Sequence, residues 1–164
     1  MTNHRKKFKD ETNRLKNWDY GSNAAYFVTI CTADRNHFFG EIKNTKMYLS
    51  DIGQVANQYW SEIPDHFPFV KLDAFVIMPD HIHGIIIIDK QIHPNDSVIQ
   101  PNKFGPQSQN LGSIVRGFKT GVTKYARMND IEFKWQSRYH DHIIRNEKSF
   151  YRIRKYIIDN PKNW

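Results

Sequence analysis

The chain has 164 residues and a mass of 19.5 kDa, a length that suits a single domain with a substantial core. Lys and Arg total 24 against 17 Asp and Glu, which gives a formal net charge of +7, and 14% of the residues are aromatic. A hydrophobic content of 39% argues against wholesale disorder. The charge and the aromatic content are compatible with a nucleic-acid partner, whose phosphates attract cations and whose bases stack on rings.

Cysteine usage and apolar run length exclude several other classes of protein. The single cysteine, Cys31, rules out an internal disulfide and a multi-cysteine zinc site. No apolar segment follows the basic N-terminus, and apolar runs such as 85–88 are far too short to cross a bilayer. We therefore expect a cytoplasmic protein with no membrane partner.

A polar, basic segment precedes the predicted folded domain. Residues 1–19 show no hydrophobic period, so we expect a flexible arm, either a solvated tail or a DNA-contacting segment. Residues 20–164 are predicted to form one domain. Within it, residues 90–110 contain three prolines and many Asn and Gln, which predicts a long loop.

Hydrophobic periodicity predicts seven elements in the order β-α-β-β-α-β-α. In chain order they are a strand at 26–30, a helix capped by Ser50 and ended by Pro64, strands at 72–78 and 82–89, a helix with an apolar face from 111 to 125, strand segments at 133–136 and 141–145, and a helix from Asn146 to 159. The first six match a ferredoxin-like split βαβ arrangement, so the predicted class is α+β: an antiparallel sheet sandwiched by helices, with an extra C-terminal helix.

Two histidines open a predicted strand. Positions two apart in a strand share a face, so His81 and His83 present their imidazoles side by side. Apolar residues continue on both faces, which predicts a central strand covered on both sides. A shared metal ion would satisfy both rings, and hydrogen bonds to water or backbone at an exposed strand end are the alternative.

The C-terminal helix carries a candidate nucleophile. Tyr156 lies at the edge of the apolar stripe, Asn160 follows one turn later, and Arg152 precedes it by one turn. A tyrosine beside a cation and near a metal is a candidate phosphoryl acceptor. The alternative is an amphipathic tyrosine at the rim of the core and an asparagine that ends a helix before proline.

Three segments together resemble a known family. They are Val76 to Gly84 (VIMPDHIHG), Trp135 to Asn146 (WQSRYHDHIIRN) and Tyr156 to Pro161 (YIIDNP). In this order and spacing they look like REP-associated tyrosine transposases, a branch of the single-tyrosine HUH transposases. The match extends over nearly the whole chain, from about residue 18 to 164.

The resemblance implies an enzyme that nicks single-stranded DNA at hairpins and transfers strands through a covalent 5′-phosphotyrosine. It implies that His81 and His83 ligate a divalent cation, Mg²⁺ or Mn²⁺, and that Tyr156 is the nucleophile. Asn160 occupies the third ligand position, where some relatives have Gln, Glu, Asp or His, and Asn is a weaker, neutral ligand. Relatives act as monomers or as homodimers with exchanged helices, and the sequence does not choose between these states.

DNA contacts are expected outside the catalytic residues. The predicted backbone contacts are the basic strip of one helix and a cation near the tyrosine: Arg116, Lys119, Lys124, Arg127 and Arg152. Trp18, Tyr20 and Trp135 are candidates for stacking on bases.

Several alternatives remain open at this point. His140 and His142 could form a second metal site or, as we favour, a hydrogen-bond network, and Tyr139 and Tyr151 are weaker nucleophile candidates. A catalytically silent or domesticated hairpin-binding protein, for DNA or RNA, is the alternative function. A metallohydrolase that uses the histidines with water is a third.

Overall fold

The computed structural model describes residues 15–91 and 109–164. Most of the predicted arm and of the predicted 90–110 loop, including His93, lies outside the described residues. The centre of the described molecule is an antiparallel sheet in the order β4-β5-β1-β6. Its strands are β1 (Ala24–Thr32), β4 (Val70–Ile77), β5 (His81–Ile88) and β6 (Trp135–Ile144). This is the ferredoxin-like strand order, so the predicted α+β fold is confirmed.

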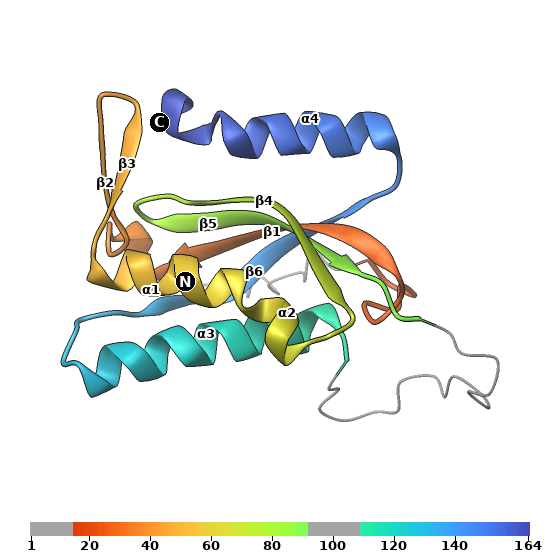
Figure 1. Cartoon of the computed structure of the whole chain (residues 1–164), viewed down its shortest axis with the longest axis horizontal. Coiled ribbons are helices and arrows are strands. Elements are labelled where there is room, and N and C mark those ends of the chain that lie inside the picture. Colours follow the sequence, from red (N-terminus) through yellow and green to blue (C-terminus); the bar gives the residue numbers. More distant parts are fainter. Residues whose placement is uncertain (1–14, 92–108) are drawn as a thin grey trace, which may run out of the picture.

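Helices cover both faces of this sheet (Figure 1). The first, α1 (Asp51–Ser61), and the long α3 (Leu111–Met128) lie below it, and α4 (Glu147–Ile158) lies above it in that view. Strand β5 shows why both faces need cover. Ile82 and Ile86 belong to the large core shared with α1 and α3, whereas Ile85 belongs to a smaller core shared with α4. The predicted central strand, apolar on both faces, is confirmed.

Side-chain caps fix where the helices begin. The Ser50 hydroxyl accepts a hydrogen bond from the Gly53 N–H at the start of α1. The Asn146 side chain accepts one from the Ser149 N–H at the start of α4. Both caps were predicted from the sequence, and each satisfies a backbone donor that the first helical turn leaves unpaired.

The structure corrects several element boundaries. Residues expected to form a loop after the first strand include a small hairpin, β2 (Gly40–Lys43) and β3 (Lys46–Leu49). Pro64 lies in the first turn of a short helix, α2 (Ile63–His66), whereas α1 already ends at Ser61. Proline suits that position because a first-turn N–H has no helical partner.

Two further differences concern the last strand and the last helix. The segments predicted at 133–136 and 141–145 are parts of one strand, β6, whose middle residues alternate between exposed and partly exposed polar side chains. Those residues gave no apolar alternation to detect. Helix α4 ends at Ile158, and Asn160 begins a short 3₁₀ turn, η2 (Asn160–Asn163).

The aromatic residues predicted to stack on bases are partly buried and pack against the core. The Trp18 Nε1 donates to the Tyr26 hydroxyl at 3.1 Å, and the Tyr20 and Tyr26 rings lie 5.9 Å apart. The Trp135 Nε1 donates to the Lys119 carbonyl at 3.1 Å. These contacts fix the orientation of the rings, and they show that the folded part already includes Trp18, which was predicted to belong to the flexible arm.

Candidate active site

Two buried imidazoles lie side by side at the start of β5. His81 and His83 point to the face covered by α4, and their ring centroids are 4.4 Å apart. The strand register places them opposite Cys31 and Thr29 of β1. Alternation along β5 and the antiparallel ladder are therefore enough to bring the two rings together.

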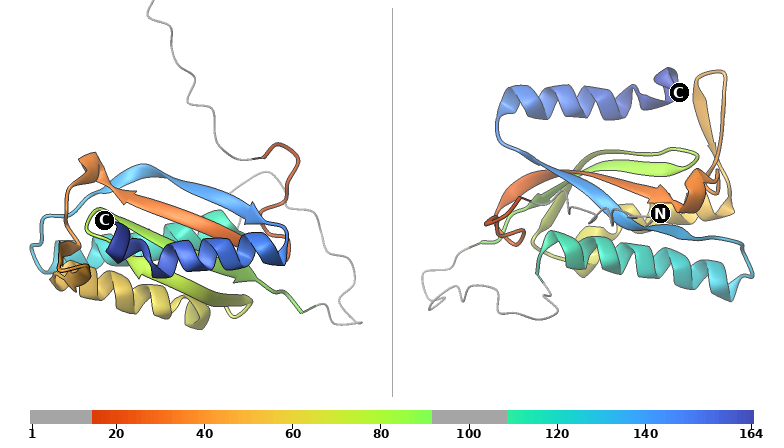
Figure 2. Two further views of the ribbon diagram at one scale, coloured as in Figure 1. Left: turned by 90° about the horizontal axis from the view of Figure 1, so that it is seen from above. Right: turned by 180° about the vertical axis from the view of Figure 1, so that it is seen from behind.

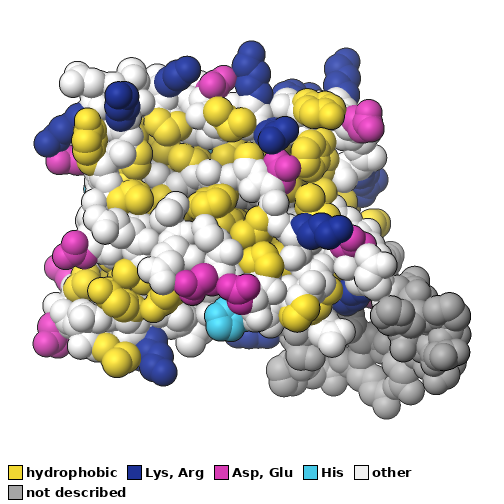
Figure 3. All heavy atoms as spheres, viewed as in Figure 1, with side chains coloured by type: hydrophobic (Ala, Val, Ile, Leu, Met, Phe, Trp, Pro, Cys, Tyr) yellow, Lys and Arg dark blue, Asp and Glu magenta, His cyan; other side chains and the backbone are white. Residues whose placement is uncertain are grey.

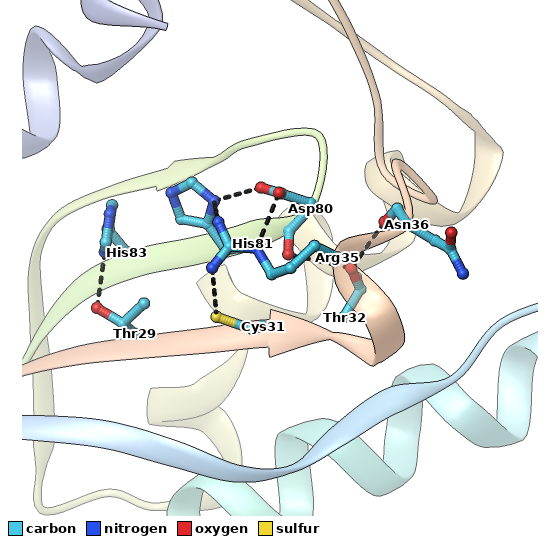
Figure 4. A network of polar contacts seen from close by, with 8 residues as sticks. All are labelled: Thr29, Cys31, Thr32, Arg35, Asn36, Asp80, His81 and His83. Carbon is cyan, nitrogen blue, oxygen red and sulfur yellow. Dashed lines mark hydrogen bonds and ion pairs between the residues drawn. The ribbon is translucent and has the colours of Figure 1, made fainter.

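Each ring is oriented through its Nδ1 atom (Figure 4). The His83 Nδ1 lies 2.8 Å from the Thr29 hydroxyl, and the His81 Nδ1 lies 2.6 Å from the Asp80 Oδ1. A carboxylate or hydroxyl on one nitrogen fixes the ring and leaves the other nitrogen to act as a ligand. The two Nε2 atoms are thus the ones available to a metal ion.

Asp80 is in turn held by Arg35 (Figure 4). The Arg35 Nε donates to the Asp80 Oδ2 at 2.9 Å, and another guanidinium nitrogen donates to the Cys31 Sγ at 3.2 Å. Arg35 lies in a short 3₁₀ turn, η1 (Ala33–Arg35), with its backbone at a φ of 56°. Sequence reasoning missed Asp80 and Arg35 as site residues. Asp80 directly precedes His81, which was a usable signal, but Arg35 reaches the site only through the fold.

Burial sets the protonation of the site. Burial lowers the pKa of His81, an effect that Asp80 partly offsets, and burial with the neighbouring His81 charge lowers the pKa of His83 to about 3. Burial raises the pKa of Asp80, but hydrogen bonds from Arg35 and His81 outweigh it, so the net shift is downward. At neutral pH the site therefore holds two neutral imidazoles and a carboxylate, which is the protonation state that binds cations.

The candidate nucleophile and the candidate third ligand reach this site from above. The Tyr156 ring lies 5.4 Å from the His83 ring and meets the Phe27 ring edge-on at 6.3 Å. Tyr156 remains half exposed, whereas Asn160 is buried and its side chain lies close enough to His81 to raise the pKa of that imidazole slightly. Helix α4 and the turn after it thus bring both predicted residues to the paired histidines.

The donor set fits a divalent cation. His81 and His83 offer two neutral imidazole nitrogens, and the Asn160 amide can offer an oxygen beside them. Within residues 15–91 and 109–164, no group of three or more His, Cys, Asp or Glu side chains forms a metal cluster. A cation here would complete its coordination with Asn160, water or a substrate oxygen, and imidazole favours Mn²⁺ over Mg²⁺.

The predicted basic strip lies on the other side of the sheet. Its four residues line a groove of about 710 Å³ between α3 and β6, together with Ser137 and Tyr139: Arg116, Lys119, Lys124 and Arg127. The Lys119 ammonium donates to the Gln136 carbonyl at 3.0 Å, and burial lowers its pKa. The structure therefore does not bring this strip together with Tyr156.

Arg152 stands apart from that strip. It is exposed on α4 one turn before Tyr156, and Lys and Arg side chains gather along the edge of the molecule where α4 lies (Figure 3). Of the five predicted DNA contacts, Arg152 is thus the one on the helix that carries the nucleophile candidate.

The alternative tyrosines lie away from the histidines. Tyr139 lines the groove on the α3 side, and Tyr151 is exposed on α4. Within the described part of the chain, Tyr156 is therefore the tyrosine whose ring contacts one of the paired histidines, His83.

The buried histidines predict a pH-dependent stability for the metal-free protein. Unfolded histidine has a pKa near 6.5 and folded His83 about 3, so the unfolded state binds more protons between these values and the free energy of unfolding falls as pH drops below about 6.5. Urea unfolding in EDTA at pH 7, 6, 5 and 4 should show this loss. The variant His83→Gln should flatten the profile, and an equal slope in both proteins would contradict it.

The arrangement is a ferredoxin-like sheet with paired histidines on a central strand and a tyrosine on the covering helix, which is what the resemblance to single-tyrosine transposases led us to expect. No family model matches the chain. A protein of Haemophilus influenzae assigned by name to the REP-associated tyrosine transposases is 31% identical over 146 residues, covering 87% of this chain and 73% of the relative. The chain belongs to the REP-associated tyrosine transposase family, and its function is of the transposase type.

Two further proteins are similar to this chain. An uncharacterised Haemophilus influenzae protein is 46% identical over 158 residues, covering 92% of this chain and 87% of the relative. The solved structure of a REP-associated tyrosine transposase bound to a REP hairpin aligns with a TM-score of 0.61 at 18% identity, over 92% of this chain and 73% of that one. That likeness concerns the fold. No described helix is long and apolar enough to span a membrane.

Proposed function

We propose that this protein is a metal-dependent endonuclease and strand transferase that acts on single-stranded DNA at hairpins and forms a covalent 5′-phosphotyrosine on Tyr156. The observation that carries the proposal is the contact of the Tyr156 ring with His83, one of two adjacent imidazoles whose Nδ1 atoms are already engaged. A tyrosine at the rim of the core needs no such neighbours. Family membership supports the same chemistry.

Each site residue has a separate role in the proposed cleavage reaction. The Tyr156 oxygen attacks the scissile phosphorus, the new P–O bond joins the enzyme to the 5′ end of the downstream strand, and the bond to the 3′ oxygen breaks. The tyrosine proton is lost and the departing oxygen gains one, so a free 3′-hydroxyl results. His81, His83 and Asn160 would hold the cation, which supplies positive charge to the phosphate oxygens. Arg152 binds the approaching backbone.

Hairpin DNA is the proposed partner. The solved neighbour is bound to a REP hairpin, and the α3–β6 groove of this chain is lined by four cations and no carboxylate. Such a groove suits a phosphate backbone. Tyr156 and the histidines of one chain already meet, which supports a site that a monomer can complete.

The direct test is a labelled hairpin with a single-stranded flank, incubated with Mn²⁺, Mg²⁺ or EDTA. A cation-dependent, SDS-resistant adduct should carry a 3′ label, whereas a 5′ label should leave on a strand with a free 3′-hydroxyl. Peptide mass spectrometry should place the adduct on Tyr156. Cleavage without an adduct would favour a metallohydrolase, and binding without cleavage would favour a catalytically silent hairpin-binding protein.

The Asp80 contact makes a separate prediction about the cation. Asp80→Asn keeps the shape of the side chain but removes the charge that orients His81, so Mn²⁺ affinity should fall about 10- to 100-fold by calorimetry. The matched control is Asp89→Asn, which removes a surface carboxylate paired with Lys71. An unchanged affinity in Asp80→Asn, or an equal loss in the control, would refute the role given to Asp80.

A further inference from the structure

Helix α4 covers only part of the sheet face that carries the histidines. It packs over β4 and β5, where Arg154 pairs with Asp73 of β4 at 3.1 Å and Ile153 and Ile157 share a core with Ile85. Viewed from above, β6 lies beside the helix rather than beneath it (Figure 2, left). Ile144, at the end of β6, belongs to the same small core as Ile153 and Ile157, but residues 138, 140 and 142 of β6 are exposed. This part of the edge of the catalytic face is therefore open.

The strand register fixes which side chains this open edge displays. Thr29 of β1 pairs with His83 on one side and with His140 of β6 on the other, and Phe27 pairs in the same way with Ile85 and His142. Directly paired residues share a face, so His140 and His142 are on the same face as His83. His140 lies two strand spacings, about 10 Å, from His83.

The exposed side chains at this edge are of the kinds that bind a polyanion. The register of β6 shifts just before Tyr139, but Ser137 and Tyr139 both line the groove on the α3 side, so Arg138 between them lies on the face of the two histidines. Arg138, His140 and His142 are all exposed. Asp141 points to the opposite face, so β6 displays no carboxylate here. The cation and the two flat rings offer phosphate contacts and stacking surfaces to a single strand.

The opposite wall of this open edge is the side of α4 that carries Tyr156. The edge-on contact of Tyr156 with Phe27 of β1 shows that this side faces β1 and β6, whereas Arg154 anchors the other side to β4. Arg152 is one turn from Tyr156 and so lies on the same side. A strand held on β6 would pass directly beside the tyrosine hydroxyl.

We propose that Arg138, His140 and His142, which we call the β6 strip, bind the single-stranded DNA next to the scissile phosphate and position it for Tyr156. The inference rests on the proposed function, because it assigns the strip to the substrate of that site. It also separates two DNA surfaces, with the hairpin backbone in the α3–β6 groove and the single strand on the opposite face of the same edge strand.

The test compares Arg138→Ala/His140→Ala with a control pair, Lys43→Ala/His66→Ala, which removes an exposed cation and an exposed histidine elsewhere. Anisotropy should measure affinity for a hairpin with a single-stranded flank and for the same hairpin with blunt ends. Loss of one stacking or phosphate contact is worth about tenfold. The strip variant should lose about tenfold or more on the flanked hairpin, keep its affinity for the blunt one, and raise KM for nicking while kcat stays within about twofold.

Equal affinities of the strip and control variants for the flanked hairpin would overturn the proposal, as would an equal loss on both hairpins. Thermal unfolding shows whether either variant has a folding defect. If Arg138→Ala/His140→Ala has one, His142→Gln takes its place in the same comparison. If the wild-type protein forms no adduct, the proposed function fails, yet the difference between flanked and blunt hairpins still reports on the strip. A drop of one bound Mn²⁺ in His140→Ala/His142→Ala would instead identify a second metal site and overturn the strip.

Discussion

Tyr156→Phe is expected to abolish the covalent adduct and to lower hairpin nicking by at least about 10³-fold, because the substitution removes the attacking oxygen. The phenyl ring retains the contacts with His83 and Phe27. Since the tyrosine is half exposed, its hydroxyl contributes little to the core. The melting temperature, Mn²⁺ affinity and hairpin affinity should therefore stay within error of the wild type, which calorimetry and anisotropy can measure.

Tyr151→Phe is the matched control for this loss. Tyr151 is on the same helix and is similarly exposed, but its ring meets Phe150 rather than a histidine. It should nick and form adducts at the wild-type rate. An adduct that survives in Tyr156→Phe and disappears in Tyr151→Phe would move the nucleophile to the other side of α4 and refute the site as assigned.

Local periodicity explains why much of the site could be predicted. The two-residue period of a strand places His81 and His83 together, and the helical period places Tyr156 one turn before Asn160. Apolar residues on both faces of β5 predict that helices cover both faces of the sheet. These relations are short in sequence, so they require no knowledge of the tertiary fold.

The orienting contacts could not be predicted in this way. Thr29 and His83 are 54 residues apart, and Arg35 and Asp80 are 45 apart, so both contacts depend on the register of β1 against β5. A slip of one residue would send these side chains to the opposite face. Nothing in the sequence near Thr29 or Arg35 marks them as neighbours of an imidazole.

The basic strip illustrates a different limit. Helical periodicity correctly separates the apolar face of α3 from its cations, but it does not say which face of the sheet α3 covers. The sheet order places α3 opposite α4, so Arg116 and Lys124 line a groove on the side of β6 away from Tyr156. Charge alone could not distinguish two DNA surfaces from one.

Gly84→Ala should strongly destabilise the protein. An added Cβ would lie 2.3 Å from the Trp60 Cζ2. Trp60 is fully buried and is held between Phe75 and Phe118, with ring centroids at 6.0 and 5.2 Å. Because the indole has little room to move, we expect a loss of about 3 kcal/mol in the free energy of unfolding, measured by urea titration.

Gly117→Ala is the matched control, because its added methyl would meet the Phe67 ring at an ordinary 3.4 Å. Replacing a glycine inside α3 should be neutral or should stabilise by up to about 1 kcal/mol. Equal effects of the two substitutions would show that the close approach to Trp60 is not what requires glycine at position 84.

The approach of Gly84 to Trp60 also connects the core to the site. Strand β5 has to shift to admit a methyl group at position 84, and His83 is the preceding residue, so Gly84→Ala should also weaken Mn²⁺ binding at temperatures where the protein remains folded. Trp60→Phe supplies space, and it breaks no hydrogen bond of the indole Nε1, which has no partner among the described residues. The double variant should therefore be more stable than the two single losses predict, by about 1 kcal/mol or more. If the two changes in the free energy of unfolding simply added, the indole of Trp60 and strand β5 would not constrain each other.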